Sequence, residues 1–402
     1  MALSLTSPDW AHLQADILGI ILDKLVALSD YVRFGAVCKP WNSIASDHKH
    51  KQKRMSLTNQ QLPWQLVITL DENGKEKLTL YDFSTSKFSN IKLRIPIPEK
   101  FNRMERCQGS SHGWLIFSEN LISLMILNPL SGAVLCLPPV CKKAFSGRFQ
   151  LQAAVDWLSL FDDVVFSKDP SSGSFEVMAI NMDHNVVAHL KFGDQVWTYS
   201  KTVNDGYFKS VAFYKGSILA ACNGGIVSLE KINGGDTSDE NRHQSSLDIK
   251  ICGELNPKLK KIYGSKGGFC LVESTKGDLL MVCQIDDSRH AFKIVELNGR
   301  FKHVPIANLD GHSLFVGKNH SILVLASKYP GCRPNSIYFS TAPTEPWRLR
   351  HENNLKYEFK IQEFNLEDGS IRYYSTVETR TSFQNILAVA GPVPWIVPSM
   401  KF

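Results

Sequence analysis

The sequence predicts a mainly β protein, in which a small unit of three short helices precedes one propeller-like domain of six or seven blades. Apolar residues recur at helical spacing only in the first part of the chain, up to about residue 55. From Trp64 onward the apolar period falls to two, and strand–turn–strand units recur at a steady spacing. We therefore divide the chain into a helical unit over residues 8–55, a linker over 56–63 and a β domain over 64–402.

The composition is that of a globular protein with a sizeable core. Of the 402 residues, 43% are hydrophobic and 21% are charged, which excludes wholesale disorder. The net charge of +6 is spread along the chain, whereas nucleic-acid binding calls for clustered basic residues, so we do not expect a nucleic-acid partner. The nine cysteines form no C-x-x-C pair, which is typical of free thiols in a reducing compartment.

No feature of the sequence directs the chain to a membrane or to the secretory pathway. The N-terminus lacks a basic segment followed by an apolar run, and no stretch reaches the ~18 apolar residues of a membrane-spanning helix. We therefore expect an intracellular protein, cytoplasmic, nuclear or both, without a membrane partner. The basic run over residues 48–54 is either a nuclear-import or phosphate-binding patch or a solvated helix end, and we favour the second interpretation.

Three helices are predicted in the N-terminal unit. The apolar residues of the first recur at helical spacing and are Ile17, Leu18, Ile21, Leu22 and Leu25. Ser29 and Asp30 mark the start of a second helix, and Pro40 fits the first turn of a third. A unit of roughly 45 residues is close to the smallest size that folds alone. It therefore covers its remaining apolar surface with a partner protein or with the large domain, and the spacing does not decide between them.

The helical segment also carries a distributed pattern with a defined start and end. It runs from Trp10 through Leu13-Gln14-Ala15-Asp16-Ile17-Leu18 to Val37-Cys38-Lys39-Pro40-Trp41. This pattern resembles the F-box family, although Gln14 stands where that family usually has proline. The resemblance implies docking on a Skp-family adaptor and, through it, on a cullin. The apolar pattern positions, which are the expected adaptor-binding residues, are Leu13, Ile17, Leu18, Leu25, Val37 and Trp41.

Strand–turn–strand units recur along the β domain. They begin at residues 66, 114, 164, 217, 269 and 321, so successive starts lie 48 to 53 residues apart, and a seventh begins at residue 359. A spacing of ~50 residues is in the range of propeller blades, each of which is a four-stranded antiparallel sheet. An irregular array of β-sandwiches is the alternative. We expect the two strands of each unit to pair as a hairpin, and in the sixth unit these strands are residues 321–325 and 336–339.

Several short segments follow one another in a characteristic order through this domain. They include Gly113-Trp114-Leu115, residues 127–132, residues 329–339 and the closing residues 394–399. Together they resemble the plant F-box family that carries a KIB-type propeller domain. The resemblance spans roughly residues 65 to 400 and implies a propeller that binds a target protein.

No catalytic motif is recognisable in the sequence. Residues 109–113 match G-x-S-x-G, but the residues that follow predict a strand, whereas a nucleophile elbow needs a helix there. The acidic pair Asp162-Asp163 points to opposite faces of a strand, and phosphate- and dinucleotide-binding loops are absent. We therefore expect no catalytic residue, no cofactor and no metal site.

Taken together, these patterns predict the substrate-recognition subunit of an SCF-type ubiquitin ligase, with an unidentified target protein on the propeller. Such a subunit raises the effective concentration of its target and supplies no catalytic side chain. One alternative is a ligand-binding, glycan-binding or enzymatic propeller whose helices only cap the fold and whose channel gathers acidic and histidine residues. Another is a transcription or chromatin adaptor that uses residues 48–54.

Overall fold

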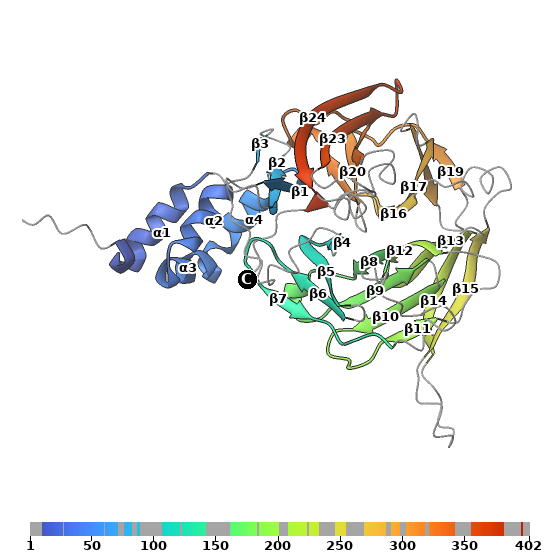
Figure 1. The fold of residues 1–402 in the computed structure, drawn as a ribbon, viewed down its shortest axis with the longest axis horizontal. Helices are drawn as coiled ribbons and strands as arrows, with labels where there is room; N and C mark the ends of the chain where they lie inside the picture. Colours follow the sequence, from blue (N-terminus) through green and yellow to red (C-terminus); the bar gives the residue numbers. More distant parts are fainter. Residues whose placement is uncertain are drawn as a thin grey trace, which may run out of the picture.

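The helices and strands follow the two-part order predicted from the sequence (Figure 1). The described α-helices precede Trp64, and the described strands begin there. None of the described helices is long and apolar enough to cross a lipid bilayer. The mainly β class with N-terminal helices is therefore confirmed. The computed structural model describes residues 10–26, 28–59, 61–70, 76–82, 87–88, 107–120, 123–141, 161–182, 185–200, 208–222, 225–232, 246–254, 269–286, 291–297, 303–317, 321–341, 355–381 and 395–396.

Four α-helices form the N-terminal unit. The three predicted ones are α1 (Ala15–Lys24), α2 (Leu28–Ala36) and α3 (Lys39–Ser46), and Pro40 lies in the first turn of α3. A fourth helix, α4 (Lys51–Asn59), extends into the stretch that we expected to be a linker. Two short 3-10 helices, η1 and η2, cover Trp10–His12 and His48–His50.

The second and third helices pack closely on each other. At Gly35 a Cβ atom would lie 3.5 Å from the Cβ of Ala45, which is ordinary van der Waals contact, so the two helices are already in contact distance there. The buried Tyr31 hydroxyl donates to the Ala45 carbonyl at 2.8 Å, and burial raises the pKa of Tyr31. The Phe34 and Trp41 rings lie with their centroids 4.5 Å apart. These contacts hold α2 and α3 together.

The basic run over residues 48–54 begins a helix, so the expectation of a solvated helix end was wrong. The run forms η2 and the first turn of α4, where positive charge opposes the dipole of α4 itself. Its charges serve the neighbouring helices. Lys53 donates to the carbonyl of Asp23 at the end of α1, and Arg54 donates to the carbonyls of Ala45 and Asp47 at the end of α3. Carbonyl groups at helix C-termini lack intrahelical partners and favour positive charge.

The described strands form six units that follow one another along the chain. The first three are β25-β1-β2-β3 (Trp395–Ile396, Trp64–Leu70, Glu76–Asp82, Lys87–Phe88), β4 to β7 (Cys107–Ser111, Trp114–Asn120, Ser123–Leu127, Val134–Cys136) and β8 to β11 (Asp163–Phe166, Glu176–Asn181, Val186–Lys191, Thr198–Ser200). The others are β12 to β15 (Phe208–Tyr214, Ser217–Cys222, Gly225–Ile232, Ser246–Glu254), β16 to β19 (Phe269–Glu273, Leu279–Asp286, Ala291–Leu297, His303–Ile306) and β21-β20-β22-β23-β24 (Ile322–Leu325, His312–Val316, Ser336–Thr341, Leu355–Asn365, Ile371–Thr381). Parallel pairing of β11 with β15 joins two of these units into one eight-stranded sheet.

Six of the seven predicted hairpins pair as expected, and the sixth does not. There the structure places β20 between β21 and β22, antiparallel to β21 and parallel to β22. The prediction was wrong because β20 was missed. The connection from β21 to β22 spans residues 326–335 and includes a 3-10 helix, η7 (Ala326–Lys328). A connection of this length can cross a strand, as parallel pairing requires, whereas hairpin loops are usually about 2–5 residues long.

Hydrogen bonds between neighbouring units close the six units into a ring. We call these contacts the inner-strand bridges. Each involves at least one side chain, and the sequence of bridges returns to its starting unit. They are Ser110 Oγ to Trp395 O (2.6 Å), Phe166 N to Ser111 Oγ (3.2 Å), Val211 N to Asp163 Oδ2 (3.1 Å), Leu271 N to Ser210 Oγ (3.3 Å), Cys270 Sγ with Ser321 Oγ (3.1 Å) and Trp395 Nε1 to Val316 O (3.0 Å).

Strand β25 joins the end of the chain to the first unit. It pairs with β1, so that Trp395 lies opposite Gln65. Trp395 is buried, and its ring meets Phe315 edge-on at 5.0 Å. One residue therefore connects three units: its backbone pairs with β1 and accepts the bridge from β4, and its side chain packs on β20 and donates to Val316.

The nine cysteines are free, as the sequence predicts. Cys107, Cys222 and Cys283 are buried, whereas Cys136 is exposed. Burial raises the pKa of the Cys270 thiol to about 12. This thiol remains protonated at neutral pH, which suits its role in an inner-strand bridge.

Candidate functional site

Exposed apolar side chains are concentrated on the helical unit. Ten large apolar side chains are exposed among the described residues, and half of them lie between residues 10 and 37. These five, which we call the helical apolar surface, are Trp10, Ile17, Ile20, Val26 and Val37. The helical unit forms a much smaller part of the chain than the β domain does, so this share is disproportionate. Concentrations of exposed apolar side chains mark interaction sites more often than single exposed residues do.

The structure separates the six predicted adaptor-binding residues into three groups. Ile17 and Val37 are 43% and 55% exposed and belong to the helical apolar surface. Leu18 is 1% exposed and lies in the hydrophobic core. The half-buried residues that pack against this core are Leu13, Leu25 and Trp41.

Helix α1 presents two distinct faces. Leu18 and Leu22, four residues apart, point inward, whereas Ile17 and Ile20, three residues apart, are exposed. Ile20 was not among the predicted residues. Its spacing from Ile17 could have identified it, because residues at i and i+3 share one side of a helix.

A hydrogen bond from α3 holds the segment that carries Trp10. The Trp41 indole N–H donates to the carbonyl of Trp10 at 3.0 Å. This bond holds η1 against α3, and the Trp10 side chain remains 59% exposed. Arg33 and Asp30 form an exposed ion pair on α2 at 2.8 Å.

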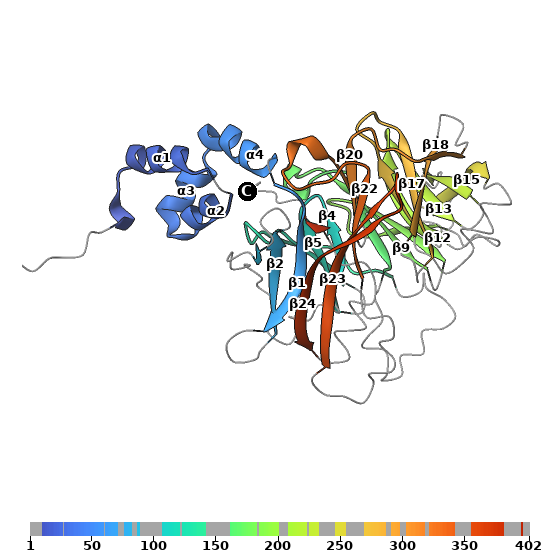
Figure 2. The ribbon, with the colours of Figure 1, turned by 90° about the horizontal axis from the view of Figure 1, so that it is seen from above.

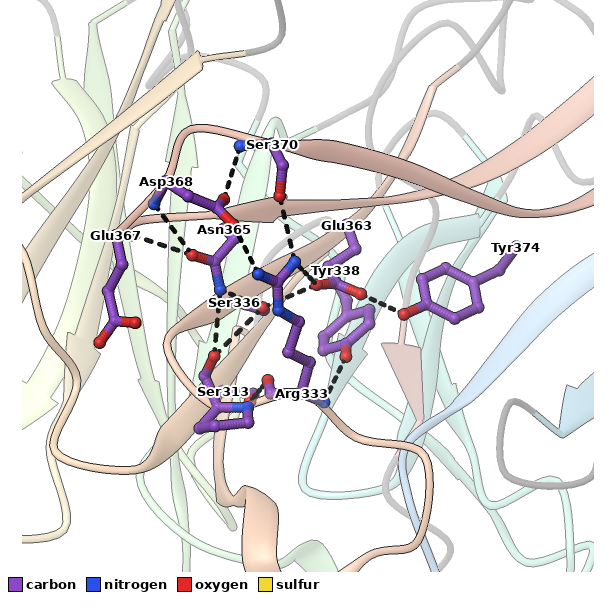
Figure 3. A network of polar contacts seen from close by, with 11 residues as sticks. Ser313, Arg333, Ser336, Tyr338, Glu363, Asn365, Glu367, Asp368, Ser370 and Tyr374 are labelled. Atoms are coloured by element: carbon purple, nitrogen blue, oxygen red, sulfur yellow. Dashed lines mark hydrogen bonds and ion pairs between the residues drawn. The ribbon is translucent and has the colours of Figure 1, made fainter.

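A network of polar contacts surrounds the buried carboxylate of Glu363 on β23 (Figure 3). Its Oε1 atom accepts from Ser336 Oγ at 2.9 Å and lies 3.4 Å from Arg333 Nη1. Its Oε2 atom accepts from the Tyr374 hydroxyl. Tyr374 lies at a β-bulge in the pairing of β23 with β24, which directs its side chain toward Glu363. The charge of Glu363 is thus compensated inside the blade.

The same network holds three surface loops together. Arg333 Nη2 donates to Asp368 at 2.7 Å, and Asn335 Nδ2 donates to Glu367 at 2.6 Å, so the loop before β22 is tied to the β23–β24 turn. The Asn335 side-chain oxygen accepts from the backbone N–H of Leu309, which adds the loop before β20. Asn335 has a φ of +56°, a conformation that asparagine adopts more readily than most residues.

The electrostatics of this network favour its hydrogen bonds. Burial, together with the hydrogen bond to Glu363, raises the pKa of Tyr374 to about 12, so its hydroxyl stays protonated and can donate. Two hydrogen bonds from Ser370, followed by that from Arg333, lower the pKa of Asp368 to about 2. Asp368 is therefore ionised at neutral pH and can pair with Arg333.

The described residues supply neither a nucleophile elbow nor a metal cluster. Residues 109–113 end β4 and form a turn into β5, so the G-x-S-x-G match lies in a hairpin, as predicted. Ser110 and Ser111 both take part in inner-strand bridges. No group of three or more His, Cys, Asp or Glu side chains in the described part of the chain is arranged to hold a metal ion.

A family model for the KIB1-4 beta-propeller matches residues 80–375, which is most of the chain. The chain belongs to this family. KIB1-4 membership confirms the resemblance recognised in the sequence and the propeller-like nature of the β domain. Residues 329–339, which contributed to that resemblance, include two hydrogen-bond partners of Glu363, namely Arg333 and Ser336.

The KIB1-4 chain is also distantly homologous to F-box proteins of Arabidopsis thaliana. A putative F-box protein of that plant is 25% identical over 399 residues, covering 93% of this chain and 96% of the relative. A second F-box protein is 22% identical over 367 residues, covering 83% and 95%. The homology therefore extends over most of the chain.

Solved structures add little to this assignment. A catalytically inactive virginiamycin B lyase from Staphylococcus aureus, solved with quinupristin, is 15% identical and aligns with a TM-score of 0.34. The alignment covers 78% of the KIB1-4 chain and 85% of the lyase. A likeness this weak supports no argument about function.

Proposed function

We propose that this protein is the substrate-recognition subunit of an SCF-type ubiquitin ligase. Residues 8–55 act as the F-box and bind a Skp-family adaptor, which connects the chain to a cullin. Residues 64–402 form the propeller that binds a target protein. The protein acts inside the cell, in the cytoplasm, the nucleus or both.

The observation that carries this proposal is the helical apolar surface. Burying an exposed apolar side chain gains about 25 cal/mol for each Å² removed from water, so several such residues together favour association. Distant homology to F-box proteins over most of the chain supports the same partner. The contact uses Ile17 and Val37 from the predicted set, together with Ile20, while Leu18 maintains the core beneath them.

The mechanism requires no catalytic side chain from this chain. The adaptor fixes the helical unit on the cullin scaffold, and the propeller holds the target near the ubiquitin-charged enzyme. Transfer then accelerates because the target lysine is present at a high effective concentration.

The test is adaptor binding by the full-length chain. We compare wild type with an Ile17→Asp, Val37→Asp double variant, using purified adaptor and calorimetry. Both positions are exposed, so the variant should fold. We expect a loss of at least 2 kcal/mol of binding free energy, about 30-fold in Kd, if these residues are hot spots.

The matched control is Val196→Asp, which introduces the same charge at an exposed apolar position on the propeller. It should bind the adaptor as wild type does. Absence of adaptor binding by a folded wild-type chain would refute the proposal. Equal loss in the control would show that the effect is not specific to the helical surface.

A further inference from the structure

Helix α4 lies between the other helices and the propeller (Figure 2). Its first turn is attached to α1 and α3 by side chains of the basic run. Arg54 Nη1 donates to Ala45 O at 2.6 Å and to Asp47 O at 2.7 Å, and Lys53 donates to Asp23 O at 2.9 Å. These acceptors belong to the C-terminal ends of α3 and α1, so two helices are fixed to α4 at once.

The C-terminal half of α4 contributes to the same hydrophobic core as the propeller. Leu57 on α4 and Leu62 just after it are buried, and both belong to one hydrophobic cluster. That cluster also contains Leu18 and Leu22 of α1 and Trp64 at the start of β1. The core of the helical unit and the core of the propeller are therefore continuous across the stretch that the sequence suggested was a linker.

Arg54 holds a central position in this junction. The Ala45 carbonyl that it contacts also accepts from the buried Tyr31 hydroxyl, so one acceptor joins α2, α3 and α4. Among the described side chains of α4, Leu57 is the only buried apolar one. The two hydrogen bonds from Arg54 therefore attach α4 to α3 at the point where α2 also meets α3.

We infer that Arg54 is a positioning residue, which locks α4 onto α3 so that the helical unit and the propeller move as one rigid body. The inference deepens the proposed function and depends on it for its biological meaning. In a ligase, a rigid junction would hold the target at a fixed distance from the adaptor. A loose junction would still bind both partners but would spread the target over many positions, which lowers its effective concentration at the ubiquitin-charged enzyme.

The test measures the distance between the two parts in the free full-length protein. Nitroxide labels are attached through azide-bearing amino acids at Ser43 on α3 and Gln195 in the β10–β11 turn, both exposed. Nine native cysteines make thiol labelling unsuitable. Pulsed electron paramagnetic resonance should give a narrow distance distribution for wild type and a broadened, shifted one for Arg54→Ala.

Lys51→Ala is the matched control, because it removes an exposed positive charge from the same helical turn. It should retain the narrow distribution. Arg54→Lys keeps the charge and a donor, so its distance distribution should have a width between those of wild type and Arg54→Ala. If Arg54→Ala does not fold, as judged by circular dichroism, Arg54→Gln replaces it under the same criteria.

An unchanged distribution in the folded Arg54 variant, or a broad one in wild type, would overturn the inference. Adaptor binding is measured on the same proteins as a separate readout. We expect Arg54→Ala to bind the adaptor as wild type does, because Ile17 and Val37 are untouched. Failure of the proposed function therefore appears in the binding measurement, and failure of this inference appears in the distance measurement.

Discussion

The helical unit and the propeller use their side chains in opposite ways. The propeller places polar side chains such as Ser111, Asp163 and Ser210 in buried positions, where they bridge neighbouring units. The helical unit leaves apolar side chains such as Ile17 and Val37 in contact with water. Both arrangements cost free energy unless a partner group is supplied. In the propeller the partner is the next unit, whereas in the helical unit the proposed adaptor would supply it.

This contrast shows where specificity resides in each part. Buried polar side chains are satisfied only in one register, so the inner-strand bridges select the closed ring over alternative pairings of similar strands. Exposed apolar side chains contribute little to the fold of the helical unit and are free to serve association. Mutations should therefore lower stability when they affect the propeller bridges and lower binding when they affect the helical apolar surface.

The largest effect on stability is expected for Trp395→Ala. Trp395 is 1% exposed and connects three units, and large-to-small changes of buried Trp or Phe typically cost ~3–5 kcal/mol. Chemical denaturation followed by fluorescence measures the change. The matched control is Trp10→Ala at 59% exposure, which should change the unfolding free energy by less than ~0.5 kcal/mol. Equal changes in unfolding free energy in the two variants would contradict the contrast between the propeller and the helical unit.

A smaller effect is expected for Ser210→Ala, which tests one bridge. The Ser210 hydroxyl accepts from the buried N–H of Leu271, and an unsatisfied buried donor costs ~1–3 kcal/mol. The same denaturation experiment applies, with the exposed Ser217 of the adjacent strand changed to alanine as the control. A Ser210 variant as stable as its control would show that the bridges accompany ring closure without stabilising it.

The sequence was most informative where a local pattern determines a local structure. Helical spacing located α1 to α3, and alternation located most strands, because each signal reflects which side of an element is buried. The sixth unit shows the limit. The parallel pairing of β20 with β22 depends on a connection that crosses a strand. The sequence of this connection, residues 326–335, does not indicate which strand β22 pairs with.

The sequence could indicate a stretch of the chain for the candidate site, but not which of its apolar side chains are exposed. The F-box pattern covers the stretch that carries the helical apolar surface, yet it could not separate Leu18 from Ile17, which are adjacent in the sequence. When apolar residues cover more than one side of a helix, some face the core and others face a partner. Only the packing of α2 and α3 determines which residues are buried. Likewise, the basic residues of α4 could be located from the sequence, but their acceptors lie on other helices.

The smallest effect is expected for Gln14→Pro, which introduces the residue usual in the F-box family. Gln14 precedes α1 with a φ of −59°, close to the value that proline imposes, and its side chain makes no capping hydrogen bond. Proline at a compatible position stabilises by ~0.4–1 kcal/mol, because it restricts the unfolded chain. Thermal unfolding should therefore shift upward, and Gln14→Ala, the control for loss of the glutamine, should not show this shift. Adaptor binding should stay the same in both variants, since the exposed residues of α1 are unchanged. A destabilised Gln14→Pro protein would mean that the entry to α1 differs from that of the family, and the helical apolar surface would then need to be redefined.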